Sequence, residues 1–146
     1  MLLNKILVMV LTRNNAVLLQ HAFESFQKYN PGCGCDFLIA DHESDNKQHL
    51  NALDVLSKKY RIVKYPNNRA EVTFNKVWKD NNNYQYYFFC HDDVSANKDN
   101  WLKVFVGRMN GGHVEKIIEN TEFAKLKIGR VGNCHQPWRN YCQEAG

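Results

Sequence analysis

The amino-acid sequence predicts an α/β protein in which a mostly parallel sheet carries helices on both faces. Apolar runs of strand length alternate along the chain with longer segments that repeat apolar residues at helical spacing. The first run, residues 5–12, is almost continuously apolar, as expected of a strand that is covered on both faces. Strands that alternate with helices are joined by crossover connections, and such connections pair the strands in parallel.

The predicted elements follow one another in a regular order. We expect strands at residues 5–12, 35–41, 60–66 and 84–90, with a last strand at 127–134. We expect helices at residues 14–29, 44–60, 69–80, 100–109 and 113–126. Asn14 or Asn15 is a suitable N-cap for the first helix. The residues that the second and third helices are expected to bury are Leu50, Leu53, Leu56, Val72, Val77 and Trp78.

The chain has the size of one domain and a composition that suits a packed core. Its 146 residues are 44% hydrophobic and 12% aromatic, so we expect a single domain over residues 1–146. The apolar N-terminus is shorter than the roughly 20 residues of a membrane-spanning helix, which predicts no membrane span. The odd number of cysteines, five, argues against a disulfide framework and for a reduced, cytoplasmic setting.

Polar side chains gather where the predicted strands end. The first strand ends in residues 12–14, the second is followed by residues 41–45, and the fourth by residues 91–93. In a parallel sheet these ends share one edge, and ligands bind there at the point where the strand order reverses. The carboxylates that would meet at this edge are Asp41, Glu43, Asp45, Asp92 and Asp93.

A cation among such carboxylates would offset their mutual repulsion. Mg²⁺ and Mn²⁺ take oxygen ligands, and Mg²⁺ uses one or two carboxylates together with phosphate oxygens. Because Arg13 and Arg69 flank the acidic edge, the pattern predicts a metal–diphosphate site. The alternative is that the Asp and Ser residues cap the helices that follow each strand. Neither G-x-G-x-x-G nor a Walker-type glycine loop is present, which argues against a dinucleotide-binding Rossmann enzyme and a P-loop nucleotidase.

In their order, these motifs resemble the nucleotide-sugar-binding half of family-2 glycosyltransferases with the GT-A fold. "ILVMVLTRNN" is similar to the first strand of the family with its Thr-x-Asn end, and "FLIADHESDN" to the second strand with its Asp-x-x-Ser end. "NNRAEVTFNKVW" is similar to the segment that ends in an Asn near the diphosphate, and "YFFCHDDVSANKDNWL" to the acidic metal motif. The resemblance covers roughly residues 5–105 and implies a Rossmann-like GT-A architecture that stops before the acceptor-binding part.

The resemblance also implies roles for the matched residues. The base pocket would be lined by Thr12, Arg13 and Asn14. Asp41 of the Asp-x-x-Ser motif, which ends at Ser44, would hold the base. Asp92 would reach the ribose or the diphosphate, Asn75 would lie near the diphosphate, and Asp93 would ligate Mn²⁺ or Mg²⁺. No catalytic base is identifiable among these residues.

The implied function is the transfer of a sugar from a nucleoside-diphosphate sugar to a hydroxyl acceptor on a glycan, a lipid or a protein. The metal would neutralise charge on the departing diphosphate. The alternative is a non-catalytic nucleotide-sugar-binding fragment or relic that lacks the acceptor half. A nucleic-acid-binding α/β domain is a third possibility, favoured by the net charge of +4 and the aromatic residues. The acidic edge argues against it, because carboxylates repel phosphate unless a metal intervenes.

The remaining cysteines and histidines have simpler explanations. Cys33 and Cys35 are closer in sequence than the usual zinc-binding pair, so reduced thiols are expected, with structural zinc as the alternative. Cys90 and His91 are adjacent on a predicted strand, so they would point to opposite faces and could not pair as nucleophile and base. The histidines of the predicted helices, which we expect to be exposed or to cap, are His21, His49 and His113.

Overall fold

The computed structural model describes residues 6–109 and confirms the α/β class, with one sheet of four parallel strands. The strands are β1 (Ile6–Thr12), β2 (Cys35–His42), β3 (Arg61–Tyr65) and β4 (Tyr86–His91). The helices are α1 (Ala16–Lys28), α2 (Lys47–Ser57), α3 (Ala70–Asp80) and α4 (Trp101–Met109). The helix expected at residues 113–126 and the strand expected at 127–134 lie outside the described residues.

The strand order is β3-β2-β1-β4. From β1 the chain crosses to β2 and β3 on one side, and it then passes back to place β4 on the other side of β1. The strand order therefore reverses between β1 and β4, whose carboxyl ends carry Thr12 and His91. We call this position the switch point, and it is where open α/β sheets bind ligands.

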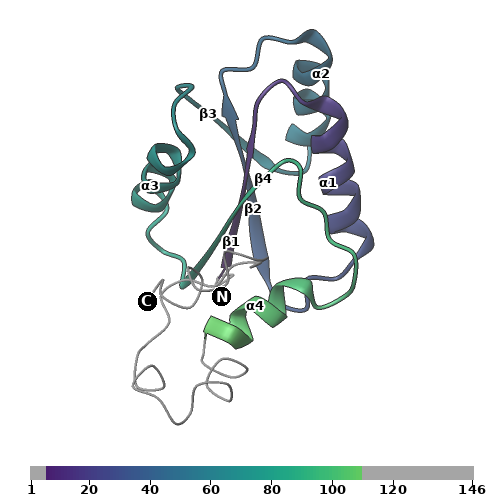
Figure 1. Cartoon of the computed structure of the whole chain (residues 1–146), viewed down its shortest axis with the longest axis vertical. Coiled ribbons are helices and arrows are strands. Elements are labelled where there is room, and N and C mark those ends of the chain that lie inside the picture. Colours follow the sequence, from purple (N-terminus) through teal and green to yellow (C-terminus); the bar gives the residue numbers. More distant parts are fainter. Residues whose placement is uncertain (1–5, 110–146) are drawn as a thin grey trace, which may run out of the picture.

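The reversal also decides which helices cover each face of the sheet. Helices α1 and α2 lie on one face and α3 lies on the other (Figure 1), as right-handed crossovers in opposite directions require. Successive side chains of β1 point to opposite faces of the sheet. Val8 and Val10 pack on the α1 side, and Leu7 and Met9 pack on the α3 side. Every residue of β1 is buried, which explains its continuous apolar sequence.

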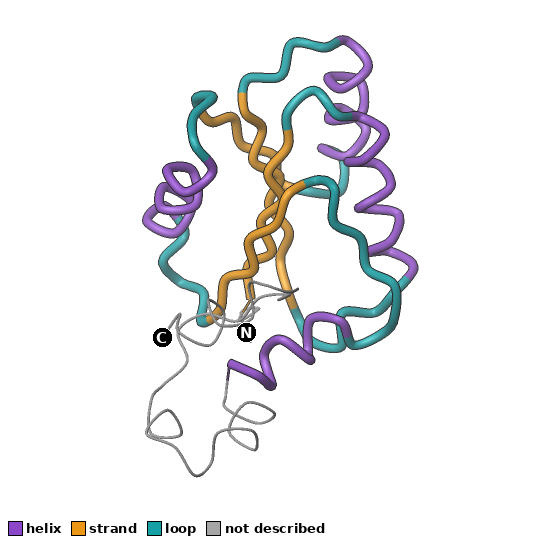
Figure 2. The backbone as a smooth tube through the Cα atoms, viewed as in Figure 1, coloured by secondary structure: helices purple, strands orange, loops and turns teal. Residues whose placement is uncertain are grey.

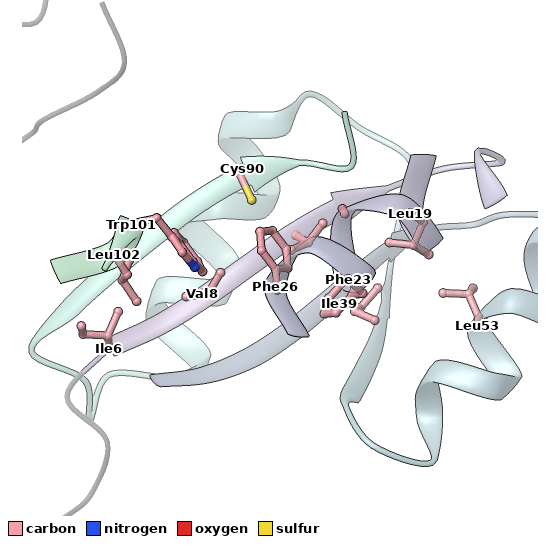
Figure 3. Packing of buried hydrophobic residues seen from close by; sticks show 12 residues of the cluster. Ile6, Val8, Leu19, Phe23, Phe26, Ile39, Leu53, Cys90, Trp101 and Leu102 are labelled. Carbon is pink, nitrogen blue, oxygen red and sulfur yellow. The ribbon is translucent and has the colours of Figure 1, made fainter. Parts of the chain in front are cut away.

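Residues 92–100, which we call the return segment, run from the end of β4 back along α1 to the opposite end of the sheet (Figure 2). The segment ends where the Asn100 amide donates a hydrogen bond of 2.6 Å to the carbonyl oxygen of Asn30. Helix α4 begins there and packs Trp101 against Phe26 of α1, with ring centroids 5.2 Å apart (Figure 3). The return segment thus connects the switch point to the far end of the core.

Two of the burial expectations for α3 are wrong. Val77 is fully buried, but Trp78 is 54% exposed and Val72 is 41% exposed. The inward face of α3 instead consists of residues three and four positions apart, namely Ala70, Thr73, Phe74 and Val77. Helical spacing, rather than the hydrophobicity of single residues, sets the orientation of this helix.

The inward face of α2 also differs from the expectation. Leu53 is buried and Leu56 is partly buried, but Leu50 is 38% exposed. His49 completes the buried face with Ala52, so the expectation of an exposed or capping side chain is wrong for His49. Within residues 6–109, no helix has the length and apolar character that crossing a membrane requires.

Candidate functional site

Thr12 and Asp92 meet at the switch point. The hydroxyl of Thr12 donates a hydrogen bond of 2.7 Å to Oδ2 of Asp92. The amide of Asp92 extends the ladder between β1 and β4 by donating to the carbonyl oxygen of Leu11 at 3.1 Å. One bond fixes the backbone of Asp92 and the other fixes its carboxylate. The structure therefore brings together two residues that the sequence predicted for the site.

His49 of α2 lies behind Thr12 and has no exposed surface. Its Nδ1 accepts a hydrogen bond from the Asn15 amide at 2.9 Å, and its Nε2 lies 3.3 Å from Oγ1 of Thr12. Oδ1 of Asp41 is 3.7 Å from the same Nε2. Burial lowers the pKa of His49, and the charges of Asp41 and Asp92 oppose this shift. A lowered pKa makes the imidazole neutral at pH 7.

Asp41 is fully buried at the end of β2 and is bound within its own loop. Its Oδ1 accepts a hydrogen bond of 2.5 Å from the Ser44 hydroxyl, and its Oδ2 accepts one of 3.2 Å from the Ser44 amide. The N-cap of helix α2 is Asn46, whose side chain accepts a hydrogen bond from the His49 amide. Asp41 and Ser44 therefore do not cap this helix. The Asp-x-x-Ser motif therefore shapes the loop after β2.

Asn14 ties the loop after β1 to the loop after β2. It has a φ of +48°, in the left-handed region that Asn tolerates better than most residues. Its side-chain amide donates to Oδ1 of Asp45 at 2.7 Å, and its Oδ1 accepts the amides of Asp45 and Asn46 at 3.0 and 2.9 Å. Its own amide donates to Oγ of Ser44 at 3.0 Å. Asn14 thereby holds the two loops in one fixed arrangement.

A second polar cluster lies on the α3 side of the same edge. Nε2 of His42 is 2.6 Å from Oγ1 of Thr73, and both side chains are buried. Nε of Arg13, an exposed residue, donates to the carbonyl oxygen of His42 at 3.1 Å. Burial lowers the pKa of His42, and the charges of Arg13 and His91 add to this shift, whereas those of Asp41 and Glu43 oppose it. The guanidinium of Arg13 therefore lies beside the buried His42–Thr73 pair on this side of the edge.

The acidic residues of the edge, as residues 6–109 place them, do not form a metal-binding group. Within residues 6–109, no three His, Cys, Asp or Glu side chains form a group that could hold a metal ion, so the expected meeting of five carboxylates is not found there. Asp93 is exposed beside Asp92, and this adjacent pair is the donor set nearest the switch point. A hard cation that arrives with a phosphorylated ligand fits such a set, because Mg²⁺ typically takes one or two carboxylates and completes its shell with phosphate and water.

Arg69 and Asn75 lie apart from these two clusters. Arg69 is exposed just before α3, and its Nε is 3.2 Å from Oε1 of Glu71. Asn75 is exposed on α3, two residues beyond the buried Thr73. Residues two apart do not share a helical face, so Asn75 lies on the outward side of α3.

The sequence contained a signal for the buried histidine that was missed. His49 precedes Ala52 by three residues and Leu53 by four, and all of them are buried on α2. This spacing places His49 on the inward face of the helix. Its polar partners could not be read in the same way, because Thr12 and Asp92 come from other elements of the chain.

The edge thus combines a hydroxyl, a neutral imidazole and carboxylates on its α1 side with a guanidinium and imidazoles on its α3 side. Such an edge can hold a cation and an anion in adjacent positions. No protein-family model matches the chain, and no curated protein matches it significantly.

Proposed function

We propose that the edge between β1 and β4 binds a nucleoside-diphosphate sugar with a divalent cation, and that the chain forms the donor-binding part of a glycosyltransferase of GT-A architecture. The observation that carries this proposal is the hydrogen bond between Thr12 and Asp92 at the switch point. It holds one carboxylate where parallel α/β sheets bind their ligands. The exposed Asp93 adds a second carboxylate for the cation.

The diphosphate is proposed to lie against Arg13. The bond from its Nε to the His42 carbonyl oxygen anchors the guanidinium at the edge, while the side chain as a whole is exposed. A guanidinium carries further N–H donors that bind phosphate oxygens in pairs. Arg69, at the start of α3, offers a second exposed guanidinium that would have to leave Glu71.

The base is proposed to lie over the joined loops after β1 and β2. Asn14 is exposed there and fixes the position of both loops. Asp41 is fully buried, so we assign it a supporting role through Ser44 instead of the direct base contact that the resemblance implies. In this proposal, the buried side chains of Thr12 and Asp41 support the base pocket from within the protein, and the exposed Asn14 lines it.

Bound at Asp93, Mn²⁺ or Mg²⁺ would supply Lewis-acid neutralisation of the charge on the departing diphosphate. Asp92, whose Oδ2 is bound to Thr12, would direct Oδ1 to the ribose or the diphosphate. The acceptor is a hydroxyl group of a glycan, a lipid or a protein.

The test is calorimetric titration with uridine, guanosine and cytidine diphosphates, each with and without Mn²⁺. We expect binding of at least one of them to require Mn²⁺, and we expect Asp93→Asn to weaken it by about tenfold or more. Asp54→Asn, which removes an exposed carboxylate from α2, is the matched control and should bind as the wild type does. Equal affinity with and without Mn²⁺, or an equal loss in Asp54→Asn, would count against the proposed site.

A non-catalytic nucleotide-sugar-binding module is the second candidate, and one observation favours it. Asp41 and Asp92, the two least exposed carboxylates at the edge, each accept a hydroxyl hydrogen bond from the protein, so neither is arranged to take a proton from an acceptor. Slow, Mn²⁺-dependent hydrolysis of the bound sugar nucleotide would favour the transferase. Binding without hydrolysis would favour the module.

A further inference from the structure

We propose that His49 is a positioning residue that acts through Thr12 to hold the carboxylate of Asp92 ready for a ligand. The ligand-binding part of this inference rests on the proposed function, whereas the hydrogen-bond geometry is independent of it. His49 has no exposed surface, so it can influence a ligand only through the residues that it contacts.

The tautomer of His49 follows from its partners. The Asn15 amide can only donate, so Nδ1, which lies 2.9 Å away, accepts and carries no proton. The proton of the neutral ring is therefore on Nε2, which faces Oγ1 of Thr12 at 3.3 Å and Oδ1 of Asp41 at 3.7 Å. A proton on Nε2 can be donated to the Thr12 hydroxyl oxygen, and it also faces the carboxylate of Asp41, which can only accept.

This tautomer leaves one direction for the hydroxyl proton of Thr12. A hydroxyl has one proton and two acceptor positions. Oγ1 accepts from His49 and donates to Oδ2 of Asp92 at 2.7 Å. All donors therefore point the same way, from the Asn15 amide through His49 and Thr12 to Asp92. Hydrogen bonds aligned in a chain polarise and strengthen one another.

The chain of bonds leaves one oxygen of Asp92 in a fixed position. Oδ2 is bound to Thr12, and the backbone amide is bound to Leu11, so the carboxylate cannot rotate without losing a bond. We assign Oδ1 to the ligand or to its cation. A carboxylate that is fixed in advance loses less conformational entropy on binding, which raises affinity.

Two amide variants distinguish the contribution of Nδ1 from that of Nε2. In His49→Asn, the shorter side chain can still accept the Asn15 amide, but it does not reach Thr12. In His49→Gln, the longer side chain places an amide donor near Thr12. Thr12→Val removes the hydroxyl with little change in volume. His21→Asn, on the exposed side of α1, controls for the loss of a histidine.

The affinity of each variant for Mn²⁺ and uridine diphosphate is measured by calorimetry, and its folding by thermal unfolding. We expect His49→Asn and Thr12→Val to lose about tenfold in Mn²⁺ affinity, as the loss of an outer-shell partner does. The double variant should lose no more than either single one, because both act in one chain of bonds. We expect His49→Gln to recover most of the affinity and His21→Asn to retain it. A folded His49→Asn with unchanged affinity, or additive losses in the double variant, would overturn the inference.

A second measurement is independent of any ligand. Long-range ¹H–¹⁵N NMR at pH 7 should show a neutral His49 ring with its proton on Nε2, and Thr12→Val should shift the Nε2 signal. A ring protonated on Nδ1, or one insensitive to Thr12→Val, would overturn the inference even if nucleotides bind. A wild-type protein that shows these signals but binds neither Mn²⁺ nor nucleotides would reject the proposed function and uphold the chain of bonds.

Discussion

The amide of Ala96 donates a hydrogen bond of 2.9 Å to Oγ of Ser25, which lies 71 residues earlier in the chain. The same hydroxyl donates to the carbonyl oxygen of Ala22 at 2.6 Å, so Ser25 uses its hydroxyl both as donor and as acceptor. Ala96 stands in the middle of the return segment, between the switch point and α4. Ser25 therefore fixes the return segment, which begins with Asp92 and Asp93, to helix α1.

Ser25→Ala should destabilise the protein by about 1 kcal/mol, because the partly buried Ala96 amide loses its side-chain acceptor. Urea denaturation followed by circular dichroism measures this loss. Ser57→Ala is the matched control, since the exposed Ser57 makes the same bond to a carbonyl three residues earlier, that of Asp54, at 2.6 Å. We expect the control to change the free energy of unfolding by less than about 0.5 kcal/mol. Equal effects of the two substitutions would contradict the anchoring role of Ser25.

Gly32→Ala should destabilise the contact between α4 and the loop after α1. Gly32 has a φ of +84°, and a Cβ there would lie 2.5 Å from Oδ1 and 2.9 Å from Cα of Asn100. The left-handed backbone alone costs about 1–2 kcal/mol for a residue with a side chain, and the Asn100 backbone cannot move aside freely. The exposed Gly34, which does not share the positive φ, supplies the control Gly34→Ala. A loss of stability in the control as large as in Gly32→Ala would contradict this prediction.

Stability should fall as the pH is lowered from about 6.5. Burial lowers the pKa of both His42 and His49 below the ordinary value of 6.5. Below that value, the unfolded chain binds protons at these rings that the folded protein does not yet bind. The free energy of unfolding therefore decreases until the pH reaches the lowered pKa values of the folded state.

Urea titrations between pH 5 and pH 8 measure this dependence. His42→Gln and His49→Gln should each make it shallower. His21→Gln removes an exposed histidine and should leave the slope close to that of the wild type. A wild-type stability that stays constant down to pH 5 would contradict the prediction.

The fold was largely predictable from periodicity. Runs of strand length and segments of helical spacing located each element up to residue 109, and the almost continuously apolar β1 indicated a strand buried on both faces. The prediction that α3 buries Val72 and Trp78 is wrong, because the inward face of the helix follows residues three and four positions apart. The inward face of that helix includes the polar Thr73, whose partner His42 is 31 residues away in the sequence. A polar residue that is buried against a distant partner makes the sequence predict an exposed face where the structure has a buried one.

The site was predictable as an edge but not as a network. The polar strand ends correctly indicated that Thr12 and Asp92 would lie close together. The role of His49 depends on contacts across 37 residues to Thr12, and from there across 80 residues to Asp92. Asp41 looked available for a ligand, because its sequence does not show that Ser44 and His49 enclose it. Local patterns give the position of a polar edge, whereas the hydrogen bonds within it depend on tertiary packing.

The thiol of Cys90 should be unreactive in the folded protein. Cys90 is buried among the core residues on the α1 side, whereas His91 is exposed and its ring lies 6.1 Å from that of Phe74 on α3. The two side chains point to opposite faces, as predicted, so His91 cannot activate the thiol. Burial, followed by the charges of Asp93 and Asp92, raises the pKa of Cys90 to about 12.

This raised pKa keeps the Cys90 thiol in its protonated, unreactive form at pH 8. Pulses of iodoacetamide, followed by mass spectrometry of the peptides, should therefore modify Cys90 only after urea unfolds the chain. Cys33 is partly exposed and should react earlier, although burial also raises its pKa. Rapid modification of Cys90 in the native protein would mean that β4 separates from α1 in solution. In that case the carboxylates of Asp92 and Asp93 would not be held at the switch point.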